Sequence, residues 1–196
     1  MRRTMKATRV DVKVFASKDS HVEGEKVLKA FHGFIQQKKI SDELILDVTT
    51  YEHVKEGPGI MLIGHEGQYG LDETKGRLGL QYSQRRAVVE GFEQALRYTL
   101  RHALVAAELI EKDEQLGGAI KFPCDEIMVR INDRLHAPAK PETWKLVEPI
   151  ARKVLSEALG ADVGLEPHAD PRELFTFTAR AKKASSPGAV LAQLKA

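Results

Sequence analysis

The residues best suited to chemistry lie in the stretch from His53 to Glu73, HVKEGPGIMLIGHEGQYGLDE. Imidazole and carboxylate groups are the side chains that bind zinc, iron or manganese. A histidine beside a carboxylate also has the composition of a general base. The candidate ligand-binding residues of this stretch are His53, His65, Glu66, Tyr69 and Asp72.

The same stretch also has a structural interpretation, as a glycine-rich hairpin whose acids are simply solvated. On a regular strand, His65 and Glu66 would point to opposite faces, so they act together only if the glycines break the strand there. The glycine spacing of GHEGQYG differs from the dinucleotide-binding fingerprint, and no helix is expected to begin there. Both interpretations stay open, and the sequence assigns no catalytic residue and no metal ligand.

A second candidate site is the RINDR motif, in which Asn132, Asp133 and Arg134 follow a strand of buried type. Strand ends that lead into loops often carry functional polar groups. The alternative is an Asx-type turn, in which Asn132 or Asp133 accepts hydrogen bonds from nearby backbone. We therefore include these three residues among the candidate ligand-binding residues.

Composition points to a soluble protein of one domain. The chain has 196 residues, a formal net charge of +2 and 42% hydrophobic residues. A nearly balanced charge argues against a nucleic-acid partner, and the absence of a run of about 18 apolar residues argues against a membrane span. One cysteine excludes an internal disulfide, and the start lacks the apolar core of a secretory signal, so we expect a cytoplasmic location.

Hydrophobic periodicity predicts an α+β fold, with mixed sheets and flanking helices. Val10 and Val12 alternate with Asp11 and Lys13, which is the period of a half-buried strand. Apolar residues at steps of three or four predict a long helix over 87–115.

Two parts of the chain share the order strand, helix, strand, strand. This pattern predicts a pseudo-repeat of halves 9–84 and 120–181, linked by the long helix, within one compact domain of residues 1–184. Residues 185–196 are expected to form a C-terminal tail. A groove between the halves would suit a ligand, and we expect a homodimer, which is the commonest oligomer.

Three motifs carry a resemblance that covers most of the chain: FHGFIQ, YEHVKEGPGIMLIGHEGQYGLDE and INDRLHAP. They resemble those of a set of small uncharacterised bacterial soluble proteins. That set has no assigned activity, so the resemblance implies no function and no site residues.

Taken together, these features favour non-catalytic binding of a small ligand or a protein partner, because no established catalytic motif is present. The alternative is a metal-dependent enzyme that uses His53, His65, Glu66 and Asp72. The sequence identifies no cofactor and leaves open whether the protein is an enzyme.

Overall fold

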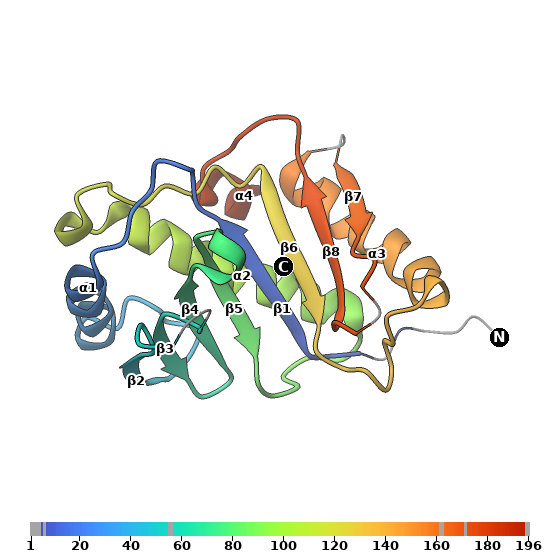
Figure 1. The fold of residues 1–196 in the computed structure, drawn as a ribbon, viewed down its shortest axis with the longest axis horizontal. Coiled ribbons are helices and arrows are strands. Elements are labelled where there is room, and N and C mark those ends of the chain that lie inside the picture. Colours follow the sequence, from blue (N-terminus) through green and yellow to red (C-terminus); the bar gives the residue numbers. More distant parts are fainter. Residues whose placement is uncertain (1–4, 6, 55–56, 161–162, 171, 195–196) are drawn as a thin grey trace.

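The computed structural model describes residue 5 and residues 7–54, 57–160, 163–170 and 172–194. Figure 1 shows the chain as one sheet with helices packed against it. The helices are α1 (Gly24–Gln36), α2 (Phe92–Lys112), α3 (Pro141–Leu159) and α4 (Pro187–Gln193), with short 3-10 helices η1 (Thr74–Gly76) and η2 (Glu114–Leu116). The strands are β1 (Val10–Phe15), β2 (Ile45–Thr50), β3 (Ile60–Gly64), β4 (Gly67–Asp72), β5 (Gly79–Gln84), β6 (Glu126–Ile131), β7 (Gly164–Pro167) and β8 (Phe175–Arg180).

The described strands form a single antiparallel sheet in the order β2-β3-β4-β5-β1-β6-β8-β7. This arrangement confirms the predicted α+β class. In place of the several mixed sheets expected, the described strands form one antiparallel sheet, because β1 and β6 pair directly, with Val12 opposite Val129. That central pair joins the strands of both halves into one sheet.

Alternation along the strands gives the sheet an apolar face and a polar face. On β1, Val10, Val12 and Val14 are fully buried in the core beneath the helices. The intervening Asp11 and Lys13 point to the opposite face, as the period of two requires. The helix α2 covers β1 and β5 on the apolar face (Figure 1).

The predicted long helix is present as α2, inside the expected range 87–115. It begins after Gly91, whose φ of 78° lies in the left-handed region that glycine tolerates best. The helix α3 contains Pro149 and continues through it. None of the described helices is long and apolar enough to cross a membrane.

The two halves share one topological feature. Each begins with a central strand and a helix, and its last strand returns to pair with the first, β5 with β1 and β8 with β6. The first half places three strands between its helix and the returning strand, whereas the second places one. The internal repeat and the limits of the predicted domain stay predictions.

The range predicted as a C-terminal tail contains the helix α4. Ser186 caps this helix, since its side-chain oxygen accepts a hydrogen bond from the Ala189 amide. Val190 and Leu194 are buried, and the helix packs against α2 and α3. Residues 187–194 therefore contribute to the folded core.

Candidate functional site

The polar face of the sheet carries a cavity of about 510 Å³. Its floor contains one side chain from each of four neighbouring strands: Gln81, Lys13, Met128 and Thr178. These residues are register partners across β5, β1, β6 and β8, so their side chains emerge side by side on one face. The floor is thus a direct product of strand pairing.

Two loops wall the cavity. The loop after β4, which contains η1, lies over β1 (Figure 1), and the backbone oxygen of Arg77 accepts a hydrogen bond from Lys13 Nζ at 2.8 Å. Lys75 of this loop forms an ion pair with Glu173 of the β7–β8 loop, at 2.7 Å between Nζ and Oε1. The Arg77 guanidinium lies 4.3 Å from the centre of the Phe15 ring. Both loops therefore bring charged side chains over the polar face.

A buried ion pair joins the floor to the loop wall. Lys13 Nζ donates a hydrogen bond to Asp72 Oδ1, and the same oxygen accepts one from the Thr74 amide at 3.0 Å. Lys13 is only 3% exposed, so burial lowers its pKa while the Asp72 carboxylate acts to raise it. Asp72, a predicted site residue, does line the cavity, but its carboxylate is already occupied by Lys13.

Arg130 differs from the other cations of the cavity. Lys13, Lys75, Arg77 and Arg180 each have a carboxylate partner within 4 Å. Arg130 lines the same cavity, and its side chain forms no hydrogen bond or ion pair with any residue that the structure describes. An arginine fork that lacks a carboxylate partner is suited to bind a planar anion.

Arg130 also has an acidic neighbour in the sheet. Asp11 is its register partner on β1, and Ser83 lies on the other side of Asp11 on β5. Burial raises the pKa of Asp11 to about 6, and the positive charge of Arg130 partly opposes this rise. The Asp11 Oδ1 atom is buried without a hydrogen-bond partner among the described residues.

Hydroxyl groups and a histidine complete the Arg130 end of the cavity. His168 Nε2 lies 2.9 Å from Thr178 Oγ1, and Thr176 is the register partner of Arg130. Burial lowers the pKa of His168, which favours the neutral ring at pH 7. This end of the cavity therefore combines the Arg130 side chain with neutral polar groups, near the ion pair of Lys75 and Glu173.

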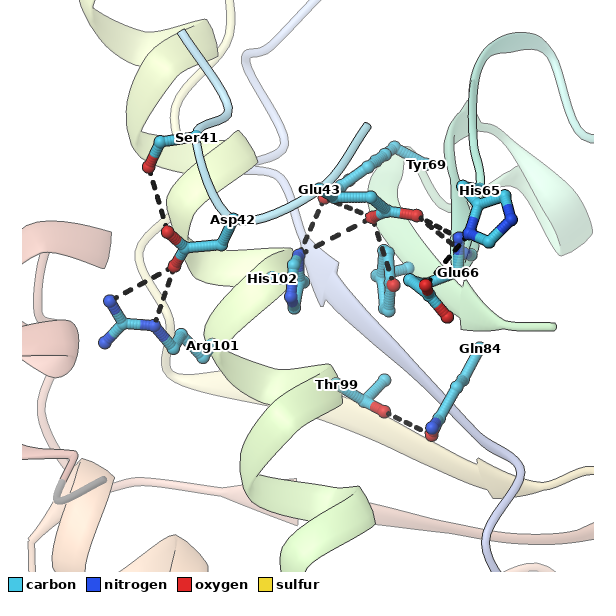
Figure 2. A network of polar contacts seen from close by, with 12 residues as sticks. Ser41, Asp42, Glu43, His65, Glu66, Tyr69, Gln84, Thr99, Arg101 and His102 are labelled. Carbon is cyan, nitrogen blue, oxygen red and sulfur yellow. Dashed lines mark hydrogen bonds and ion pairs between the residues drawn. The ribbon is translucent and has the colours of Figure 1, made fainter. Parts of the chain in front are cut away.

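Tyr69, another predicted site residue, belongs to a separate buried network on the helix-facing side of the sheet (Figure 2). Its hydroxyl donates to Glu43 Oε2 at 2.9 Å, and Tyr82 donates to the same oxygen at 3.1 Å. The backbone amides of Glu66 and Gly67 donate to Glu43 Oε1, at 2.9 and 2.6 Å. The Glu43 carboxylate thus ties its loop to the β3–β4 turn.

The network also determines the tautomer of His102. Tyr69 has a single hydroxyl proton, which it gives to Glu43, so the 2.8 Å contact with His102 Nδ1 requires that nitrogen to carry the proton. Burial lowers the pKa of His102, which keeps the ring neutral. The Glu43 carboxylate, the Tyr69 hydroxyl and His102 Nδ1 are engaged with one another within the protein, which indicates a structural role.

His65 and Glu66 do come together, in the turn between β3 and β4. His65 Nδ1 lies 2.9 Å from Glu66 Oε1, and both side chains are partly exposed (Figure 2). The glycines do interrupt the strand here: β3 ends at Gly64 and β4 begins at Gly67. The pair lies at the opposite end of β4 from Asp72, about 20 Å away at 3.3 Å per residue.

His53 lies at a third place. It follows β2 at the end of the hairpin away from His65, and its exposed ring stacks on Tyr51 with centroids 6.2 Å apart. The predicted cluster is therefore divided among three parts of the sheet. Within the described residues, no group of three or more His, Cys, Asp or Glu side chains is placed to hold a metal ion.

Asn132, Asp133 and Arg134 lie outside the cavity lining, although Arg130, the first residue of the same RINDR motif, belongs to it. Asp133 Oδ1 accepts a hydrogen bond from the His136 amide at 3.0 Å, and Oδ2 lies 2.7 Å from His136 Nδ1. Arg134 donates to the backbone oxygen of Arg172 at 2.7 Å, and the Asn132 amide donates to the Arg9 oxygen. The contact of Asp133 with the His136 amide matches the turn interpretation, in which an Asx side chain accepts a hydrogen bond from nearby backbone.

Sequence reasoning missed Lys13, Arg130, His168, Thr176 and Thr178. A signal for four of them was present, because each occupies a polar position in an otherwise apolar alternating strand. The alternation was used to predict the buried residues of these strands, whereas the polar residues between them were not assigned a role.

No known family model and no curated protein matches this chain. The candidate site is accordingly defined by its geometry: a cavity on the polar sheet face, lined by Arg130 and by charged side chains that form ion pairs with one another.

Proposed function

We propose that this protein binds a small anionic molecule, without catalysing its conversion, in the cavity on the polar face of the sheet. A volume of about 510 Å³ lies within the roughly 300–1,000 Å³ of small-molecule sites. The lining combines apolar side chains such as Met128 with a few convergent polar groups, which is the usual composition of such sites.

The observation that carries this proposal is the state of Arg130. An arginine on the cavity wall without a carboxylate partner among the described residues leaves five N–H donors for a ligand. The other cations of the cavity hold the loops in place through their ion pairs, so they are less able to bind a ligand.

Protein-observed NMR with inorganic phosphate and with benzoate tests the proposal. We expect the amide signals of residues 126–131 and 175–180 to shift on titration with at least one of these anions. The shifts should disappear in Arg130→Met and persist in Arg86→Met, which removes an exposed arginine outside the cavity lining. Saturable shifts confined to the β3–β4 turn would instead favour a site at His65 and Glu66.

The expected homodimer also receives support from one observation, and we propose that it forms through β2. This strand is one edge of the sheet. Four of the six exposed large hydrophobic residues among those described lie on it or beside it: Leu44, Leu46, Tyr51 and Val54. An antiparallel edge strand can pair with a second copy of itself around a twofold axis.

Light scattering after size exclusion tests this assembly. We expect the wild-type protein to elute as a dimer and Leu46→Asp as a monomer. The control Val88→Asp changes an exposed apolar residue away from β2 and should remain dimeric. A monomeric wild-type protein would contradict the proposal. The metal-dependent alternative, the cytoplasmic location and the absence of a nucleic-acid partner stay predictions.

A further inference from the structure

The cavity offers one positive charge to a ligand. Arg130 is the cation without a carboxylate partner among the described lining residues, and Lys13 is held by Asp72. A phosphate monoester carries a charge of about −1.5 to −2 at pH 7, so one arginine would leave much of that charge unbalanced. A carboxylate carries one negative charge and fits the guanidinium fork through two parallel hydrogen bonds.

The remainder of the cavity suits an apolar body. Met128 lies in the floor beside Lys13, and Phe15 and Pro58 also line the space. The charged groups at this end, Arg77 and Glu126, are paired with each other at 2.9 Å. A ligand body placed here therefore meets apolar surface and charges that are already neutralised.

Asp11 lies where a ligand bound to Arg130 would change its protonation. It is the register partner of Arg130 on the same face of the sheet and is only 3% exposed. One of its carboxyl oxygens has no hydrogen-bond partner among the described residues. In the empty protein, Arg130 is the cation that most favours the charged form of Asp11. A bound carboxylate neutralises the charge of Arg130, so this charge no longer favours the ionised form of Asp11.

We infer that the cavity selects a monocarboxylate with an apolar body, and that Asp11 takes up a proton when this ligand binds to Arg130. The inference rests on the proposed function, because it names the ligand class and the proton linkage of that same site.

The sign of the linkage follows from the charges around Asp11. Arg130 on β6 and Ser83 on β5 face it, and Lys13 lies two residues along β1. The carboxyl begins with a pKa of about 6, and loss of the Arg130 charge raises this pKa further. Above about pH 6, binding therefore requires proton uptake, and affinity falls as the pH rises, by up to about tenfold per pH unit.

His168 is the competing source of a pH effect. It lines the cavity, and the Arg130 charge contributes to lowering its pKa. Glu173 and Lys75 also act on this ring, with opposite signs. The two groups are separated by Asp11→Asn, which mimics the protonated carboxyl, and by His168→Gln, which removes the imidazole.

Calorimetric titration with 2-naphthoate, benzoate and 4-phenylbutyrate between pH 5.5 and 8.5 tests the inference, with 2-naphthamide and inorganic phosphate as comparisons. We expect at least one carboxylate to bind more tightly than phosphate, and the neutral amide not to bind. The Kd of that carboxylate should rise at least tenfold from pH 6 to pH 8 in the wild type and in His168→Gln. It should change less than threefold in Asp11→Asn, and binding should be lost in Arg130→Met.

The outcomes separate the two proposals. Carboxylate binding that needs Arg130 but keeps the same pH dependence in Asp11→Asn would overturn the proton linkage and leave the anion site intact. Phosphate binding more tightly than every carboxylate would overturn the ligand class alone. Failure of all the anions to bind, at every pH and in Asp11→Asn, would overturn both proposals. A wild-type Kd that stays constant from pH 6 to pH 8 would overturn the linkage without any variant, and if Asp11→Asn does not fold, loss of the pH dependence in His168→Gln would overturn the assignment to Asp11.

Discussion

The buried ion pair between Lys13 and Asp72 makes a quantitative prediction about stability. Both residues are more than 90% buried, and their charged atoms are in direct contact. In Lys13→Met, the Asp72 carboxylate keeps only the Thr74 amide and the neighbouring backbone. In Asp72→Leu, the ammonium group keeps only carbonyl acceptors such as that of Arg77. Each single change should cost about 3–5 kcal/mol, because it leaves a buried charge without its counter-ion.

The double variant is expected to behave differently. Replacing both residues with apolar side chains of similar size removes the cost of burying charge, so Lys13→Met/Asp72→Leu should lie within about 1 kcal/mol of the wild type or be more stable. Urea unfolding at pH 7 measures all four free energies, and at roughly 2–4 °C per kcal/mol each single variant should melt about 6–20 °C lower. Single variants that lose less than about 1 kcal/mol would refute the assignment of a desolvated pair.

Three further predictions concern other buried groups. Glu43→Ala should lower the free energy of unfolding by more than about 3 kcal/mol in urea, because it removes the acceptor of four hydrogen bonds. Deleting α4 should lower the melting temperature, since burial of Val190 and Leu194 contributes about 3–6 kcal/mol. Asp11→Asn should stabilise the protein by about 3 kcal/mol at pH 8 and by little at pH 3.5. The folded-state pKa of about 6 exceeds the ordinary aspartate pKa of 3.8, so stability is lost as the pH rises through 6.

Each of these predictions has a control and a contrary result. Asp42→Ala removes an exposed ion pair beside Glu43 and should cost about 1 kcal/mol or less; an equal loss in both variants would contradict the proposed network. Gln193→Ala changes an exposed position of α4 and should leave the melting temperature unchanged. A deletion of α4 with the wild-type melting temperature would show that the helix adds no stability. For Asp11→Asn, a stabilisation that is the same at both pH values would contradict the raised pKa.

The elements of the fold were largely accessible from the sequence. Alternation in VDVKVF and EIMVRI predicts strands, and both form strands at the centre of the sheet. The apolar spacing within 87–115 predicts the long helix. Which strands pair was not accessible, because register depends on contacts such as Val12 with Val129, which are more than a hundred residues apart.

The candidate site was accessible only in part. Asp72 was named and does line the cavity. Tyr69 and Asp72 are three residues apart on one strand, so alternation alone places them on opposite faces. The glycines of this stretch also have a packing reason: a Cβ on Gly67 would lie 2.4 Å from the Tyr82 hydroxyl. The glycines that suggested a functional site in the sequence therefore also provide space that the buried network needs.

The central claim is that a small anion binds at Arg130 on the polar face of the sheet. A crystal structure of the protein with 2-naphthoate tests it most directly. We expect a carboxylate with both oxygens about 2.7–2.9 Å from the Arg130 guanidinium nitrogens, and the naphthyl ring against Met128 and Phe15. A ligand held elsewhere, with the cavity empty and Arg130 paired to a protein carboxylate, would contradict it.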